Sequence, residues 1–323
     1  IQSRIDFRHN TTMSAIARQQ KTKGEAYIVE AEKGLSKSSW FSNKDKKFED
    51  AAELYGKAGN AFKVGGLYHE AGDAYKKAAE LFRDKLQNSF EASKALQNAG
   101  SNYKKSSPEH AVEAYNAAIL LMTDAGRVMQ AAKLSKECAE LYENEQIDME
   151  DKSSAVLAIE TYEQAAELFS AEDANGQASQ CLAKVAELCS VVLDPPDLTR
   201  AAQLYDDLGR RCLDSNLLKF NAKGYFLQAI FCHLAQGDAV AVTQSIQRYE
   251  ALDYTFGGSR EGKFASQLLE CVEGMDTEGF ATACYEYDRV SKLDPWKTSM
   301  LVKVKRTIDD EGGEDEEDDF DLT

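Results

Sequence analysis

The sequence has little proline, no long apolar run and no cysteine pair at metal-ligand spacing. Its 323 residues include only four prolines. Because a proline inside a helix costs roughly 3 kcal/mol, their scarcity leaves room for long helices. The longest apolar run covers residues 117–122, whereas a helix that crosses a bilayer needs about 20 apolar residues. The composition therefore predicts an all-α protein that is not embedded in a membrane.

Recognisable catalytic motifs are also missing. The sequence contains no glycine-rich phosphate loop, no HExxH and no GxSxG. The four histidines lie far apart along the chain, and His233, within FCHLA, has the apolar neighbours of a core residue. We therefore expect no enzyme, no metal site and no cofactor.

Basic residues are too few for a protein that binds nucleic acids through its overall charge. Lysine and arginine number 38 against 55 aspartates and glutamates, which gives a net charge of −17. A surface this acidic is not attracted to DNA or RNA phosphates. Ten carboxylates and no base lie in residues 309–321, so the rest of the chain carries only −7. We expect residues 309–323 to form a disordered acidic tail, because they bury too little apolar surface to fold.

The N-terminal residues and the cysteines bear on the cellular compartment. Residues 1–12 contain no apolar core of a secretory signal, and Met13 is a candidate initiator, so residues 1–23 are treated as a leader of uncertain status. The seven cysteines are odd in number and lack any CxxC pair. That pattern is typical of buried free thiols in a reducing compartment, which favours the cytosol.

A repeat runs through the first two thirds of the chain. Each copy opens with a small residue, most carry an aromatic residue four or five positions later, and apolar residues recur at spacings of three and four. The clearest copies are AAELYGKAGNAF (51–62), AGDAYKKAAELF (71–82), AVEAYNAAILLM (111–122), AAKLSKECAELY (131–142), AIETYEQAAELF (158–169) and AAQLYDDLGRRC (201–212). A step of about 20 residues holds one helix and a short turn, so two steps form a helical hairpin.

The hairpins are expected to pack through their small residues. Small side chains let neighbouring helices approach closely, while Tyr, Phe and Leu fill the space between layers. Turn signals agree with the spacing; they are Gly65-Gly66, Ser106-Ser107-Pro108, Asp124-Ala125-Gly126 and Asp194-Pro195-Pro196. Beyond about residue 214 the helical pattern continues without the regular step. We therefore predict a helical-hairpin array at 24–213, a helical bundle at 214–308 and the tail.

An insert at residues 34–47 interrupts the start of the array. Trp40 and Phe41 lie there among Ser, Asn and Lys, outside any periodic pattern. They either cap the first hairpin or contact a membrane. In a membrane, burying an aromatic side chain contributes roughly 1.5–3 kcal/mol and each nearby lysine up to about 1 kcal/mol. Such a sum supports weak, reversible attachment.

The residues alone leave the roles of two further features undecided. Scattered basic residues either form solvated faces or line one face that meets an acidic partner. They are Lys104, Lys105, Arg127, Lys133, Lys184, Lys219 and Lys223. The end of the tail, DDFDLT, is either a solubilising appendage or a ligand for a basic pocket.

Longer stretches resemble the soluble NSF attachment proteins of the alpha type, adaptors that bridge SNARE complexes to the ATPase NSF. The matching stretches are KFEDAAELYGKAGNAFK (47–63), TDAGRVMQAAK (123–133), DSNLLKFNAKGYFLQAIFCHL (214–234), REGKFASQLLE (260–270) and YDRVSKLDPWKTSMLVKVKRTI (287–308). The similarity runs from about residue 24 to the end and includes the acidic run with a penultimate leucine. It implies an all-α, right-handed array of tetratricopeptide-like helical hairpins, forming a twisted sheet of helices, and then a C-terminal helical bundle.

The resemblance also implies roles for individual residues. Those that match the family's SNARE-binding surface are Lys104, Lys105, Arg127, Lys133, Lys184, Leu217, Phe220 and Lys223. Those that match its NSF-binding end are Asp238, Glu270, Glu273, Asp318, Asp319, Asp321 and Leu322. Family members contact membranes through a hydrophobic loop, and Trp40 and Phe41 fall in the corresponding insert. Gln180 stands where the family has another lysine, so SNARE binding should be weakened without being lost.

The leading hypothesis is a cytoplasmic adaptor that associates peripherally with membranes. It would bind the four-helix SNARE complex, of the syntaxin type and its relatives, and recruit and stimulate the NSF hexamer for SNARE disassembly in vesicle fusion and trafficking. The alternative is a generic tetratricopeptide-like scaffold that binds a peptide ligand. The step near 20 residues and the absence of the W-x2-L-G-x2-Y pattern argue against it. A third hypothesis, a lipid-binding structural protein, depends on Trp40 and Phe41 alone.

Overall fold

The computed structural model describes residues 14–37, 44–145, 147–148 and 152–313. The secondary-structure elements of these residues are all α-helices, which confirms the predicted all-α class. The chain divides into two compact units, the first ending at Ala178 and the second beginning at Ser179. The predicted limits of the array and the bundle, 24–213 and 214–308, stay a prediction. None of the described helices combines the length and the apolarity that a bilayer span requires.

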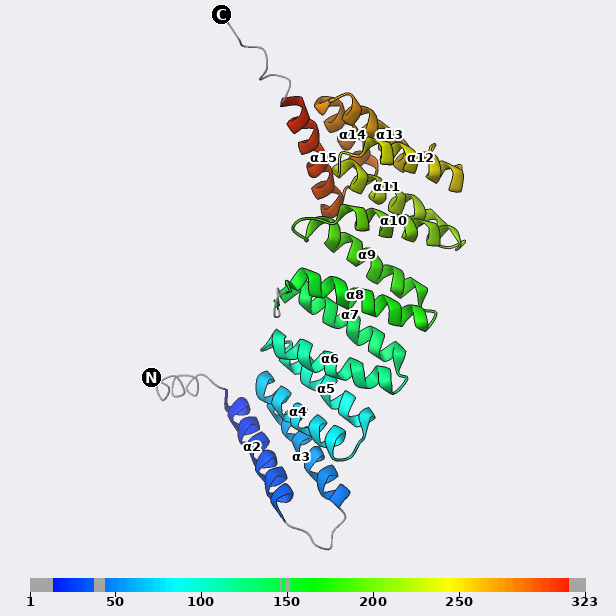
Figure 1. Cartoon of the computed structure of the whole chain (residues 1–323). Coiled ribbons are helices and arrows are strands. Elements are labelled where there is room, and N and C mark those ends of the chain that lie inside the picture. Colours follow the sequence, from blue (N-terminus) through cyan, green and yellow to red (C-terminus); the bar gives the residue numbers. More distant parts are fainter. Residues whose placement is uncertain (1–13, 38–43, 146, 149–151, 314–323) are drawn as a thin grey trace, which may run out of the picture. The chain divides into compact units, whose positions relative to one another are not determined.

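In the first unit each helix packs against the next one along the chain (Figure 1). The helices are α2 (Ala15–Ser36), α3 (Lys44–Val64), α4 (Tyr68–Asp84), α5 (Ser89–Tyr103), α6 (Pro108–Asp124), α7 (Val128–Glu145) and α8 (Ser154–Ala171). The next helix, α9 (Asn175–Val191), begins in the first unit and ends in the second. Consecutive packed hairpins are the arrangement that the repeat predicts.

The predicted turns all lie at the ends of helices, although Pro108 is already the first residue of α6 and Asp124 still its last. Gly65-Gly66 separates α3 from α4, and Gly126 lies between α6 and α7. Gly66 and Gly126 adopt φ angles of 74° and 70°, in the left-handed region where a side chain is disfavoured and glycine is not. Glycine at these two positions therefore ends one helix and allows the chain to reverse into the next.

Aromatic rings of the array pack directly onto glycines of neighbouring helices. A Cβ on Gly72 of α4 would lie 2.4 Å from Cε1 of Tyr103 on α5, and a Cβ on Gly100 of α5 would lie 2.3 Å from Cε1 of Tyr115 on α6. Both rings are almost completely buried. Glycine is required for an approach this close, because any other residue would overlap the ring. The prediction that small residues admit neighbouring helices, with aromatics filling the layers, is confirmed.

The second unit is built around one helix, α11, that is apolar on nearly all sides. Its buried residues include Phe226, Ile230 and Phe231, and it packs against α10, α12, α13 and α15. A helix that is apolar all round must be surrounded by others, which explains why the regular step fades here. Besides the end of α9, the helices of this unit are α10 (Leu198–Leu213), α11 (Lys219–Ala235), α12 (Ala239–Leu252), α13 (Arg260–Glu273), α14 (Thr277–Val290) and α15 (Pro295–Gly313).

The last helix, α15, is tied to α9 and α11 through a buried tryptophan. The Trp296 indole Nε1 donates a hydrogen bond of 2.9 Å to Ser190 Oγ on α9. Its ring lies 6.3 Å from the Phe231 ring on α11, stacked nearly parallel to it. Lys303 Nζ donates to the carbonyl oxygen of Ser190 at 2.6 Å. These contacts fix the helix that leads into the acidic tail.

Candidate protein-binding surface

In the first unit, two of the predicted SNARE-binding cations join α5 to α7. Lys104 directly follows α5, and its Nζ lies 3.3 Å from Glu137 Oε1 on α7. Arg127 directly precedes α7; its Nη1 donates to Ser93 Oγ on α5 at 2.8 Å, and its guanidinium lies 4.6 Å from the centroid of the Phe90 ring. Each cation is thus held in place, and Lys104 is exposed whereas Arg127 is half-buried.

The structure brings Lys133 to the same pair of helices but turns Lys105 elsewhere. Lys133 is exposed on α7, one and a half turns after Arg127. Lys105 Nζ instead lies 4.6 Å from the centroid of the Tyr68 ring at the start of α4. Of the four cations predicted in this unit, three are therefore associated with α5 and α7, and the fourth contacts α4.

Glu137 is a residue of this surface that sequence reasoning missed. Its Oε1 accepts a hydrogen bond of 3.0 Å from the Tyr115 hydroxyl and also faces Lys104. Burial, and the nearby Glu137 carboxylate, raise the pKa of Tyr115, so the phenol stays protonated and donates. Glu137 follows Lys133 by four residues, the spacing of a helical ion pair. That spacing is the one signal that could have drawn attention to it.

In the second unit, the predicted apolar pair is almost fully exposed. Leu217 lies in the turn between α10 and α11 and exposes 90% of its surface, and Phe220 in the first turn of α11 exposes 76%. The Lys219 Nζ lies 5.6 Å from the centroid of the Phe220 ring. A single exposed apolar side chain of this size is common on protein surfaces. Several of them together, with cations beside them, mark an interaction site.

Lys223, one turn after Phe220, connects α11 to the turn between α12 and α13. Its Nζ donates to the carbonyl oxygen of Thr255 at 3.3 Å and lies 3.9 Å from Asp253 Oδ2. Burial acts to raise the pKa of Asp253, but hydrogen bonds from Thr255 and the charges of Lys223 and Lys219 outweigh it. The net effect is a lowered pKa for Asp253, so the carboxylate stays ionised and holds Lys223 in position.

The remaining predicted SNARE-binding cation, Lys184, lies on α9. Its Nζ is 3.2 Å from Glu187 Oε2, three residues further along the same helix. Gln180, where the resemblance leads one to expect a lysine, is exposed one turn earlier. An ion pair with this much exposure contributes only about 0–1 kcal/mol to stability.

The predicted NSF-binding carboxylates of the second unit lie on α13 and at the start of α12. Asp238 caps α12, because its Oδ1 accepts a hydrogen bond of 2.8 Å from the backbone N–H of Ala241. Such a cap is worth about 1 kcal/mol, so Asp238 has a structural role whatever it binds. Glu270 and Glu273 are exposed near the end of α13.

Six predicted residues lie outside the part of the chain that the structure describes. They are Trp40 and Phe41 of the insert and Asp318, Asp319, Asp321 and Leu322 of the tail.

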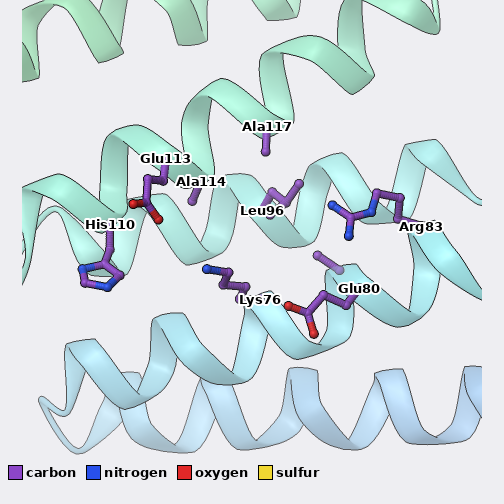
Figure 2. A pocket seen from close by; sticks show the side chains of 9 residues that line it. Lys76, Glu80, Arg83, Leu96, His110, Glu113, Ala114 and Ala117 are labelled. Carbon is purple, nitrogen blue, oxygen red and sulfur yellow. The ribbon is translucent and has the colours of Figure 1, made fainter. Parts of the chain in front are cut away.

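Two recesses among the described residues of the first unit are lined by none of the predicted binding residues. Figure 2 shows one of about 200 Å³, in which Lys76, Glu80 and Arg83 of α4 face His110 and Glu113 of α6. Its charged groups are of both signs around small apolar residues of α5 and α6. Within the described residues, no three His, Cys, Asp or Glu side chains are arranged to hold a metal ion.

Five of the seven cysteines are buried, and Cys271 and Cys284 are partly exposed. Burial raises the pKa of the Cys138 thiol to about 12 and that of the Cys284 thiol to about 11. These two thiols therefore stay protonated near neutral pH and are poor nucleophiles.

Comparison with known proteins gives matches over most of the chain. A family model described as "Soluble NSF attachment protein, SNAP" matches residues 22–309. The chain is 39% identical over 298 residues to a protein of Vitis vinifera named alpha-soluble NSF attachment protein, covering 92% of this chain and 98% of the relative. It is 36% identical over 287 residues to the Homo sapiens protein of the same name, covering 88% and 94%. It is 37% identical over 294 residues to a Coprinopsis cinerea protein named vesicular-fusion protein SEC17, covering 91% and 98%.

Proposed function

Because the chain belongs to the soluble NSF attachment protein family, we propose that it is an adaptor that binds SNARE complexes and recruits and stimulates the ATPase NSF. The names of its relatives connect the family with NSF attachment and with vesicular fusion. The protein would act in the cytoplasm, associate peripherally with membranes and catalyse nothing itself. Its part in disassembly would be to attach the ATPase to its substrate.

The observation that carries this proposal is the exposed pair Leu217 and Phe220 beside two lysines. Removing a side chain of this kind from water contributes roughly 1.5–3 kcal/mol, and that gain is available only when a partner covers the pair. Lys219 and Lys223 lie next to them on α11. An apolar centre with cations at its edge suits a helical bundle that presents both apolar and carboxylate side chains.

Electrostatics supports a basic binding surface on a chain of net negative charge. Lys104, Arg127 and Lys133 lie on or beside α5 and α7 in the first unit, and half-buried Lys184 lies on α9 in the second. Charges of this kind mainly steer association and select the partner. Binding to an acidic bundle should therefore weaken as ionic strength rises. Several copies around one bundle would add many such weak contacts into useful avidity.

The acidic end of the protein would serve NSF. Glu270 and Glu273 are exposed on α13, and the tail beyond α15 carries a dense run of carboxylates that ends at Leu322. Trp40 and Phe41 of the insert would add a weak, reversible contact with the bilayer. The chain would thus connect the SNARE complex, the ATPase and the membrane.

The test is the affinity for an assembled SNARE bundle. Replacing Leu217 and Phe220 together by serine removes two exposed contacts without disturbing the core, and we expect the dissociation constant to rise at least tenfold, which is about 1.4 kcal/mol. Leu120→Ser is the control, because Leu120 is 63% exposed on α6 and belongs to no predicted site. Unchanged affinity of the double variant would contradict the proposed surface.

The same assay separates an adaptor from a peptide-binding scaffold. A generic tetratricopeptide-like scaffold would bind a short extended peptide from a SNARE as well as the folded bundle. The proposed adaptor should bind the folded bundle strongly and the extended peptide poorly, because its contacts are spread over helices rather than confined to one groove.

A further inference from the structure

Among the described aromatic residues of the second unit, Tyr254 is the most exposed. It lies in the turn between α12 and α13 and exposes 92% of its surface. An aromatic ring that stays exposed to water contributes nothing to the stability of its own chain. Its position in the turn DYTFGG has no periodic pattern that would single it out in the sequence.

The backbone on both sides of Tyr254 is fixed. Asp253 Oδ1 accepts hydrogen bonds from the Thr255 backbone N–H at 2.9 Å and from the Thr255 hydroxyl at 2.6 Å. Phe256 is fully buried and contacts the rings of Phe226 and Tyr249, with centroid distances of 6.0 and 5.7 Å. The ring of Tyr254 is therefore presented to solvent by a rigid turn, so a partner that covers it orders only two side-chain torsions.

The same turn adjoins the apolar pair of α11. Lys223 Nζ donates to the carbonyl oxygen of Thr255, the residue after Tyr254. Lys223 follows Phe220 by three residues and therefore shares a face of α11 with it. Lys223 thus connects the face of α11 that carries Phe220 to the turn that carries Tyr254, and α11, α12 and α13 pack against one another.

We propose that Tyr254 is a third apolar contact for the SNARE bundle and extends the surface of Leu217 and Phe220 across Lys223. This inference depends on the proposed function, since it adds a residue to the same surface. Two aromatic anchors separated by a lysine fit a helical partner whose apolar side chains alternate with carboxylates. Asp253 offsets the charge of Lys223 but not that of Lys219, and a single excess charge suits the separate carboxylates of a protein better than the continuous negative charge of an anionic membrane. A protein occupant is therefore favoured over a membrane.

The test compares Tyr254→Ser with Tyr285→Ser for binding to an assembled SNARE bundle. Tyr285 is 66% exposed on α14 and serves as the matched control. We expect Tyr254→Ser to raise the dissociation constant about tenfold, Tyr254→Phe to retain near-normal affinity because the ring remains, and Tyr285→Ser to change nothing. Thermal unfolding of all three variants should match that of the parent, since both tyrosines lie outside the core.

Each outcome bears on one claim. If the Leu217→Ser/Phe220→Ser variant binds weakly and Tyr254→Ser binds normally, the inference about Tyr254 is wrong while the proposed function survives. If both variants bind normally, the proposed surface itself is wrong. Flotation with anionic vesicles in the absence of SNAREs forms the second arm. A loss of flotation in Tyr254→Ser, with normal SNARE affinity, would assign the residue to lipid and overturn the inference.

Discussion

Replacing Gly100 by alanine should destabilise the first unit, although alanine is normally the better helix former. A Cβ at this position would lie 2.3 Å from Cε1 and 2.4 Å from Cδ1 of Tyr115, far inside van der Waals contact. The ring cannot move aside easily, because Tyr115 is fully buried and its hydroxyl is hydrogen-bonded to Glu137 at 3.0 Å. The array must therefore separate α5 from α6 to accommodate one methyl group.

The size of the effect follows from two opposing contributions. Overpacking of a well-filled core costs typically 1–3 kcal/mol, and the tethered ring places this site near the upper end. The higher helix propensity of alanine stabilises the folded state by about 1 kcal/mol relative to glycine. A net loss of about 2 kcal/mol should lower Tm by about 4–8 °C, since 1 kcal/mol shifts the Tm of a domain of about 150–250 residues by about 2–4 °C.

Gly56→Ala provides the internal control. Gly56 lies inside α3, and a Cβ there would meet nothing within 4 Å, so the same substitution should stabilise by about 0.5–1 kcal/mol. Urea denaturation followed by circular dichroism, with an unchanged m-value, measures both variants. If Gly100→Ala were as stable as Gly56→Ala, the close packing of ring on glycine would not be what spaces the helices.

Two further predictions concern the second unit. Burial lowers the pKa of His233 below 6.5 in the folded state, so the unfolded chain binds the proton at a higher pH than the folded chain does. The free energy of unfolding should therefore fall as pH drops through 6.5. His233→Gln should flatten this part of the pH–stability curve measured by urea denaturation. An equally steep fall in the variant would contradict this assignment. Trp296→Phe removes the hydrogen bond from Nε1 to Ser190 Oγ, while Ser190 Oγ keeps its bonds to the carbonyl oxygens of Ala186 and Glu187. The substitution should therefore cost about 0.5–1.5 kcal/mol in urea denaturation, the net contribution of one hydrogen bond. A cost near zero would mean that the bond does not hold α15 to α9.

The helices and turns could be predicted because their signals are local. Small residues and aromatics recur with the helical step, and Gly66 and Gly126 mark turns that need a left-handed backbone. The regular step fails at α11 for a physical reason. That helix is buried by four others, so its apolar residues follow a three-dimensional environment rather than a repeat.

The candidate surface could be predicted only in part. Leu217, Phe220 and Lys223 could be matched to the family, and the structure shows that the first two are exposed and that the third connects α11 to the next turn. The contact of Glu137 with Lys104 and the separation of Lys105 from Lys104 could not be predicted, because each depends on which side chain of another helix lies opposite. The exposure of Tyr254 could not be predicted either, because no periodic pattern marks the turn that carries it.

The central claim, that the chain couples NSF to SNARE complexes, is tested most directly by disassembly of a fluorescently labelled SNARE bundle. The assay contains NSF and ATP, with and without the full-length protein, and the Leu217→Ser/Phe220→Ser variant serves as the matched comparison. The account predicts ATP-dependent disassembly with the protein, none in its absence and a reduced rate with the variant at limiting concentration. Disassembly by NSF that is equally fast with and without the protein would contradict the account.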